Sequence, residues 1–246
     1  MAKVHHVSSR TIKRKLDKYE VIFHGIDPTS TVVIMDTSYF GHEFGVMVFR
    51  DEYSKRNLHW KYVKHESLSE YIYGIERLKK QGWNIKGIVC DGKRGLFTAF
   101  GDIPVQMCQF HQAAIVTRYI TRNPKTIAGK ELKQIIVLLP RTDKESFEGV
   151  LKEWILKWNI FLNEKTYNEE NKSKWHYTHK RLRSAYQSLK HNLPYLFTWY
   201  DYPQLKMPNT TNSLEGTFSN LKTKLRVHNG LKQWRKMKVI NNILNS

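Results

Sequence analysis

Apolar residues in the first hundred positions occur in short runs rich in β-branched side chains, which is the pattern of buried strands. The predicted strands cover residues 31–35, 44–49, 58–63, 85–90 and 104–107. Residues 67–81 instead carry apolar positions at spacings of three and four, which predicts a helix that ends at Gly82. A shorter helix is expected to end near Phe100. Three strands followed by helix, strand, helix and strand predict an α/β fold with a mixed sheet flanked by helices.

The next hundred residues show helical spacing of apolar positions and no strand signal. The positions that carry this spacing are Leu132, Ile135, Ile136, Leu139, Phe147, Val150, Leu151, Trp154, Ile155, Trp158, Leu182, Tyr186, Leu189 and Leu193. Residues 163–174 are polar and predict a loop, and a helix resumes over 210–226. The pattern predicts an all-helical insertion over 109–208, within an α/β domain formed by 26–108 and 209–246.

Residues 1–25 are predicted to be a separate basic segment. Ser8 can cap a short helix in which Ile12 and Leu16 lie on one side. The segment resembles the recognition helix of a helix-turn-helix, whose partner helices would have to precede Met1. A basic leader without such partners is an equally open interpretation.

The net charge of the chain is the feature of its composition that says most about its partners. The 246 residues include 41 Lys and Arg against 22 Asp and Glu, a formal net charge of +19. Such an excess indicates a polyanionic partner, above all nucleic acid, although a solubilising surface or a ribosomal or membrane-surface protein is an alternative. No apolar run approaches the roughly 20 residues that span a bilayer, and two cysteines make no disulfide framework. We therefore expect a cytoplasmic protein with no membrane partner.

Asp36 and Asp91 each follow one of the predicted buried strands. Aspartate is a poor strand former, and two aspartates at the carboxyl ends of strands suggest a shared site. Two carboxylates so close repel each other, and a divalent cation such as Mg²⁺ removes that penalty. For either residue alone, the end of a strand or the cap of a helix is the simpler interpretation, since Asp91-Gly92 is also an ordinary turn sequence.

Glu215 is an isolated acid, because residues 216–246 contain seven Lys or Arg and no carboxylate. Thr210, Thr211 or Asn212 can cap a helix that would hold Glu215 in its first or second turn. A favourable interaction with the helix dipole explains that position without any chemistry. A third carboxylate for the same cation is the alternative.

Four motifs around these carboxylates occur in an order known from one family. They are residues 33–36 (Val-Ile-Met-Asp), 88–96 (Ile-Val-Cys-Asp-Gly-Lys-Arg-Gly-Leu), 106–111 (Gln-Met-Cys-Gln-Phe-His) and 210–216 (Thr-Thr-Asn-Ser-Leu-Glu-Gly) with the tail 221–231. With the helical insertion before the last motif, they resemble the DDE transposases of bacterial insertion sequences, in the branch related to mutator-like elements. The resemblance extends from about Thr31 to the C-terminus.

The resemblance implies a ribonuclease-H-like fold in which Asp36, Asp91 and Glu215 are catalytic and hold two divalent ions, Mg²⁺ with Mn²⁺ as a substitute. In that family, water cleaves a phosphodiester at the end of the element, and the freed 3′-hydroxyl attacks target DNA without a covalent protein intermediate. The implied partners are double-stranded DNA, as terminal repeats and as target, and further copies of the chain. A dimer or larger assembly on DNA, associated with the nucleoid, is expected because two DNA ends must be held together.

DNA contacts are expected from basic residues near both ends of the chain and from one histidine in between. These residues are Arg10, Lys13, Arg14, His111, Lys222, Lys224, Arg226 and His228. Cys108 and His111 form a Cys-x-x-His pair, which is half a zinc site, yet the only other thiol, Cys90, falls inside a predicted strand. Zinc is therefore disfavoured, and the resemblance implies a structural or strand-positioning role for the pair.

Two other functions stay open. A ribonuclease-H-like nuclease or junction resolvase would cut DNA without joining it, although the helical insertion and the Thr-Thr-Asn-x-x-Glu sequence favour a transposase. A truncated, catalytically dead remnant would only bind DNA. The intact set of three carboxylates argues against dead chemistry, whereas a missing recognition domain would impair transposition.

Overall fold

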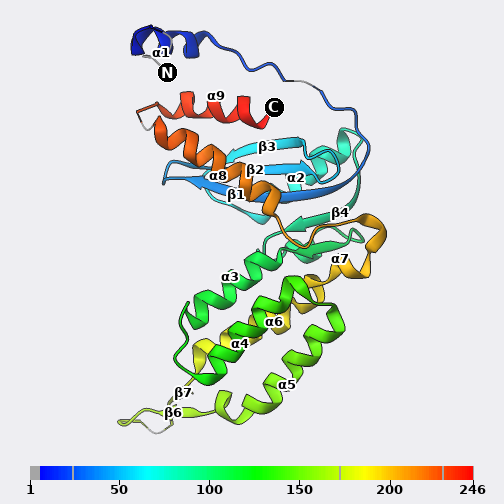
Figure 1. Cartoon of the computed structure of the whole chain (residues 1–246), viewed down its shortest axis with the longest axis vertical. Helices are drawn as coiled ribbons and strands as arrows, with labels where there is room; N and C mark the ends of the chain where they lie inside the picture. Colours follow the sequence, from blue (N-terminus) through cyan, green and yellow to red (C-terminus); the bar gives the residue numbers. More distant parts are fainter. Residues whose placement is uncertain (1–5, 24, 172, 229, 246) are drawn as a thin grey trace. The chain divides into compact units, whose positions relative to one another are not determined.

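The computed structural model describes residues 6–23, 25–171, 173–228 and 230–245 (Figure 1). The chain forms two compact units that are discontinuous in sequence. The first unit comprises Met1–Ser30, Asp36–Asn84 and Asn212–Ser246, and the second comprises Thr31–Met35 and Ile85–Thr211. The first strand, β1 (Ser30–Phe40), therefore contributes residues to both units.

Five strands form one sheet in the order β3-β2-β1-β4-β5. The strands after β1 are β2 (Phe44–Asp51), β3 (Asn57–Val63), β4 (Asn84–Cys90) and β5 (Val105–Met107). The pair β2–β3 is antiparallel, whereas β4–β5 is parallel. The prediction of an α/β fold with a mixed sheet flanked by helices is confirmed.

Two sequence predictions about this sheet are wrong in detail. β1 does not end before Asp36 but continues to Phe40, because Thr37, Tyr39 and Phe40 are themselves good strand formers. The helix expected to end near Phe100 is reduced to a 3₁₀ turn, η1 (Leu96–Thr98).

Helix α2 (Leu68–Lys80) packs against β2 and β3 in the first unit. Ser67 caps its start by accepting the N–H of Glu70 at 3.2 Å. Gly82 follows its end with a φ of +94°, a conformation that glycine adopts without strain. Gly74 lies so close to Phe49 of β2 that a Cβ atom would be 2.0 Å from the Cζ atom of that ring. The helix can approach the sheet this closely only with glycine at this position.

The C-terminal helix α9 (Gln233–Leu244) packs against β3 in the same unit. The indole N–H of Trp60 donates to Asn241 Oδ1 at 2.9 Å, and the hydroxyl of Tyr62 donates to the same oxygen at 2.7 Å. The amide of Asn57 also donates to the carbonyl of Leu244 at 2.8 Å. Aromatic side chains of an otherwise half-buried strand are thereby covered, and their polar atoms find partners.

Helix α1 (Ser9–Lys18) also forms hydrogen bonds and an ion pair with α9. Lys238 Nζ donates to the carbonyls of Asp17 and Tyr19 at 2.7 and 2.9 Å, which satisfies the last turn of α1. Arg235 pairs with Asp17 at 2.6 Å, and the Tyr19 hydroxyl donates to Asn242 at 2.5 Å. The partners of α1 in the described residues thus come from the opposite end of the sequence, whereas the helix-turn-helix interpretation places them before Met1.

The second unit is built on four long helices that pack side by side (Figure 1). They are α3 (Gln109–Ile120), α4 (Ile127–Leu138), α5 (Lys144–Leu162) and α6 (Lys180–Leu196). The 3₁₀ turn η2 (Leu139–Arg141) lies between α4 and α5, and the short α7 (Thr198–Asp201) and the 3₁₀ turn η3 (Pro203–Leu205) follow α6. Their core includes Leu132, Phe147 and Trp154, whose indole N–H donates to the carbonyl of Ala128 at 3.1 Å. Within the described ranges, no helix combines the length and apolar character needed to cross a membrane.

The prediction of an all-helical insertion is wrong, because a hairpin interrupts it. Strands β6 (Lys165–Tyr167) and β7 (Trp175–Tyr177) are antiparallel and flank most of the polar segment that predicts a loop. Trp175 of this hairpin is 44% exposed. Three-residue strands without buried positions give no periodic signal in the sequence.

Gly74→Ala is expected to destabilise the chain by about 1–3 kcal/mol, because the new methyl group would overlap the buried ring of Phe49. Gly149→Ala in α5 is the matched control, since no described atom lies within 4 Å of the position of its Cβ. That change should stabilise the helix by about 0.5–1 kcal/mol. Urea unfolding measures both values, and equal free energies of unfolding for the two variants would contradict this packing.

His59 of β3 stacks beside Phe49, and burial, followed by the charges of Arg77 and Lys61, lowers its pKa to about 4 from an ordinary value of 6.5. Between these two values the unfolded chain binds more protons than the folded chain. The free energy of unfolding should therefore fall as the pH drops from 6.5 to 4. Urea unfolding at pH 7 and pH 5 should show a smaller loss in His59→Gln than in the native chain, and an unchanged loss in the exposed control His176→Gln. Identical losses in the native chain and His59→Gln would refute the assignment.

Candidate functional site

Asp36 lies inside β1, next to a run of four fully buried apolar residues. The residue is 8% exposed, and its Oδ1 atom accepts the backbone N–H of Thr37 at 2.7 Å. A buried carboxylate in the middle of a strand carries a large desolvation penalty unless it is paired or binds a cation. Its position is therefore not that of an ordinary strand end.

Asp91 directly follows β4 in the second unit. Its Oδ1 atom accepts the backbone N–H of Lys93 at 3.1 Å, which is the contact of an Asx turn. The side chain is partly exposed, so its second oxygen can accept a further ligand. The turn accounts for one oxygen of Asp91, and it leaves a role in binding open to this residue.

Glu215 lies in the first turn of α8 (Asn212–Val227), in the first unit. Its Oε1 atom is buried and has no hydrogen-bond partner among the residues that the structure describes. Leaving a carboxylate oxygen buried without a donor costs free energy, and such atoms are rare in folded proteins. A cation would satisfy this oxygen, so the residue fits the role of a metal ligand.

Arg50, which the sequence analysis missed, fixes the helix that carries Glu215. Its guanidinium is buried at the end of β2 and donates to the carbonyl of Ser213 at 2.6 Å and to the hydroxyl of Thr217 at 2.8 Å. Its Nε atom donates to Asn57 Oδ1 at 2.9 Å. Burial lowers the pKa of Arg50 below its usual value, against the opposing effect of the Glu52 charge. The contacts bracket Glu215 on both sides in sequence.

Asp51 shows that burial alone does not identify a functional carboxylate. It is 4% exposed, less than Asp36, yet both of its oxygens are used locally. Oδ1 accepts the N–H of Tyr53 at 3.1 Å, and Oδ2 accepts the N–H of Ser54 at 2.9 Å. Asp51 therefore holds the turn between β2 and β3.

Cys108, between β5 and α3, binds the segment that precedes α8. The backbone N–H and the hydroxyl of Thr211 donate to its sulfur at 3.3 and 3.5 Å, and the N–H of Gln109 donates to the carbonyl of Asn209 at 2.9 Å. Burial raises the pKa of the Cys108 thiol, but interactions with His111 and Thr211 outweigh it, so the pKa lies below its usual value. These contacts support a structural role for Cys108, while DNA contact by His111 stays a prediction.

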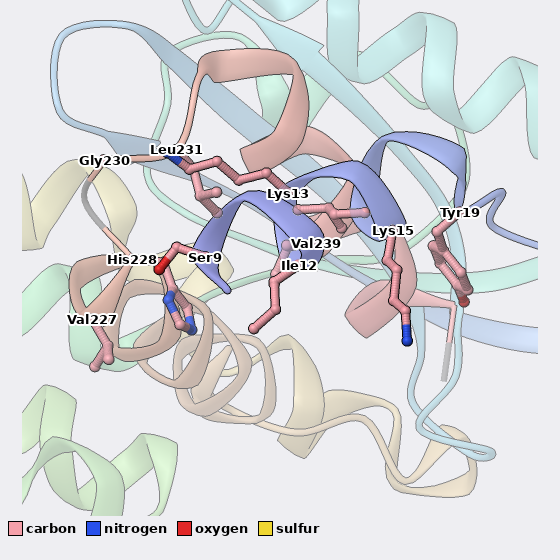
Figure 2. Close-up of a pocket in the computed structure, with 11 residues that line it drawn as sticks. Ser9, Ile12, Lys13, Lys15, Tyr19, Val227, His228, Gly230, Leu231 and Val239 are labelled. Atoms are coloured by element: carbon pink, nitrogen blue, oxygen red, sulfur yellow. The ribbon is translucent and has the colours of Figure 1, made fainter. Parts of the chain in front are cut away.

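The lysines and arginines that we expect to contact DNA are all exposed, in agreement with that role. They are Arg10, Lys13 and Arg14 of α1 and Lys222, Lys224 and Arg226 of α8. Figure 2 shows that Lys13 and His228 line one pocket of about 560 Å³ together with apolar residues such as Ile12 and Leu231. Two of the predicted contact residues, from opposite ends of the sequence, are thus brought together.

The three candidate carboxylates are distributed over both units. Asp36 and Glu215 belong to the first unit and Asp91 belongs to the second. Asp36 lies in β1 and Asp91 follows β4, and these two strands are neighbours in the sheet.

Comparisons with known proteins give a weak structural likeness and no match in sequence. No protein-family profile matches the chain, and no curated protein matches it in sequence. Among solved structures, the chain is similar to a chain in the cryo-electron-microscopy structure of the simian T-cell lymphotropic virus intasome in complex with the PP2A regulatory subunit B56 gamma. The alignment covers 74% of this chain and 66% of that chain, at 13% identity and a TM-score of 0.27. A likeness of this size assigns neither a fold nor an activity.

Arg50→Met should destabilise the chain by about 2–3 kcal/mol, because it removes charge-assisted hydrogen bonds and leaves the Ser213 carbonyl without its donor. Hydrogen exchange should accelerate first at the amides of the first turns of α8. Arg56→Met, at an exposed arginine of the neighbouring turn, is the control and should change the free energy of unfolding by less than about 0.5 kcal/mol. Equal effects of the two substitutions in urea unfolding would show that Arg50 does not fix α8.

Proposed function

We propose that this chain is a metal-dependent polynucleotidyl transferase that cleaves and joins DNA strands, a DDE transposase of the kind found in bacterial insertion sequences. The proposal includes a ribonuclease-H-like arrangement of the sheet. The observation that carries it is the buried Oε1 atom of Glu215, which has no hydrogen-bond partner in the described part of the chain and lies in a segment otherwise free of acids. A carboxylate kept in such a place at a cost in stability is best explained by a ligand that it binds.

Asp36, Asp91 and Glu215 are the residues proposed to hold two divalent ions, Mg²⁺ or Mn²⁺. Carboxylates suit these hard cations, which take oxygen ligands and retain water or phosphate oxygens. When bound, the ions supply activation of the attacking oxygen and stabilisation of the leaving oxygen of a phosphodiester. All three residues would contribute carboxylate oxygens to these ions.

The remaining groups of the chain position these ligands and the DNA. Arg50 fixes the first turns of α8 through Ser213 and Thr217, and so limits where the carboxylate of Glu215 can lie. Exposed cations on α1 and α8 bind phosphates without regard to base sequence. Double-stranded DNA and a second copy of the chain are the proposed partners, and the bacterial cytoplasm is the proposed location.

Asp36→Asn, Asp91→Asn and Glu215→Gln should each lower strand cleavage and strand transfer by more than about a hundredfold, because each removes a charged ligand of the metal ions. The assay uses labelled duplex DNA with the sequences that flank the gene on each side, with supercoiled plasmid as target and Mg²⁺ present. Asp102→Asn, at an exposed aspartate of the second unit, is the control and should keep full activity.

The outcomes of this assay separate the candidate functions. Cleavage without joined product would identify a nuclease. Binding of the same DNA without either product would identify a DNA-binding remnant. Full activity in Asp36→Asn would end the carboxylate hypothesis.

A further inference from the structure

The hairpin β6–β7 carries side chains that the proposed function does not use. Lys165 pairs with Tyr177, and Tyr167 pairs with Trp175. Directly opposite residues of an antiparallel pair lie on the same face, and so do alternate residues along each strand. We call this face the hairpin strip, which consists of Lys165, Tyr167, Trp175 and Tyr177. Thr166 and His176 lie on the opposite face.

Contacts within the hairpin strip hold its rings in place. Lys165 Nζ lies 3.8 Å from the centre of the Trp175 ring, and the rings of Trp175 and Tyr177 meet edge to face at 5.2 Å. The guanidinium of Arg183, from α6, lies 3.9 Å from the centre of the Tyr177 ring. A two-stranded hairpin alone is marginally stable, so these contacts contribute to its order. The rings of Trp175 and Tyr177 are therefore presented in fixed positions.

Hairpin stability alone does not account for the exposure of these rings. Tyr167 remains 55% exposed and Trp175 remains 44% exposed after all contacts within the chain. In Figure 1 the hairpin projects from one end of the helices of its unit. Two large aromatic side chains opposite each other on an exposed hairpin form a surface that can receive a flat ligand.

The charge around the hairpin strip favours an anionic ligand. Residues 163–183 contain six Lys or Arg and three acids, and one of these acids, Glu164, pairs with His179 at 2.9 Å. Glu169 and Glu170 lie in the turn that follows Tyr167. Neither Lys165 nor Arg183 has a carboxylate partner within 4.0 Å in the described part of the chain. Cations that are not neutralised, set beside exposed rings, match a ligand that combines phosphates with flat bases.

We propose that the hairpin strip binds single-stranded nucleic acid, with unpaired bases stacked on Tyr167 and Trp175 and with phosphates held by Lys165 and Arg183. Stacking on aromatic side chains beside a cationic track is how proteins bind single strands without reading sequence. Paired bases hide their faces inside the duplex, so the strip prefers single strands over duplexes. This binding goes beyond strand cleavage and joining, and it needs no metal ion.

The test measures fluorescence anisotropy of a labelled oligothymidylate of about 12 nucleotides, within the usual size of such sites, and of a duplex of equal length. EDTA is present throughout, so that catalysis plays no part. Trp175→Leu and Tyr167→Leu should each weaken binding of the single strand about tenfold and binding of the duplex less than about twofold. Lys165→Gln should reduce the slope of log K against log salt by about 0.7, the value for one phosphate contact on a single strand.

Leucine is chosen because it keeps an apolar side chain in the strand but has no aromatic face. Trp175→Phe should retain most of the affinity, and His176→Ala, on the opposite face, should retain all of it. Asp36→Asn should bind the oligothymidylate as the native chain does, which separates this proposal from the proposed catalysis. Native affinity in Trp175→Leu would show that the strip only supports the hairpin. Equal losses on single strand and duplex, or no preference of the native chain for single strands, would also overturn the proposal.

Discussion

A buried guanidinium joins the antiparallel half of the sheet to the helix that carries Glu215. Arg50 can be buried only because three different groups, the Asn57 amide, the Ser213 carbonyl and the Thr217 hydroxyl, accept its hydrogen bonds. A buried charge that lost these acceptors would cost several kcal/mol. The pairing of β2 with β3 and the start of α8 must therefore be correct at the same time. The position of Glu215 in its unit follows from the geometry of the sheet.

Most of the fold could be predicted because its signals are local. Each strand of the main sheet contains a short apolar segment. The spacing of apolar residues and the capping residue Ser67 predict α2. The hairpin β6–β7 could not be predicted, since contacts of Lys165 and Tyr177 with the Trp175 ring stabilise it and no residue of its strands is buried. Arg50 could not be found for a related reason. Its partner Ser213 lies 163 positions away, and a single arginine after an apolar run resembles the end of a strand.

The sequence identifies candidate carboxylates by residue type and context. It does not distinguish them from carboxylates that only stabilise the fold. Asp51 and Asp36 both lie in apolar strands, and the sequence alone does not distinguish them. Asp51 gives both oxygens to a turn, whereas Glu215 keeps one oxygen buried without a donor among the described residues. Whether an individual oxygen has a hydrogen-bond partner is decided only in the folded chain. The presence of such partners distinguishes a carboxylate that stabilises the fold from one that is retained at a cost in stability.

The division of β1 between two units has a consequence for the order in which the chain folds during synthesis. The second unit uses Thr31–Met35 and Ile85–Thr211, so the ribosome has made all of its residues before the last segment exists. The first unit needs Asn212–Ser246, and with it α8 and α9. Domains begin to form as soon as their residues emerge. The first unit, which contains both Asp36 and Glu215, is therefore the last to be completed. A chain that ends before Asn212 has all residues of the second unit but lacks α8 and α9.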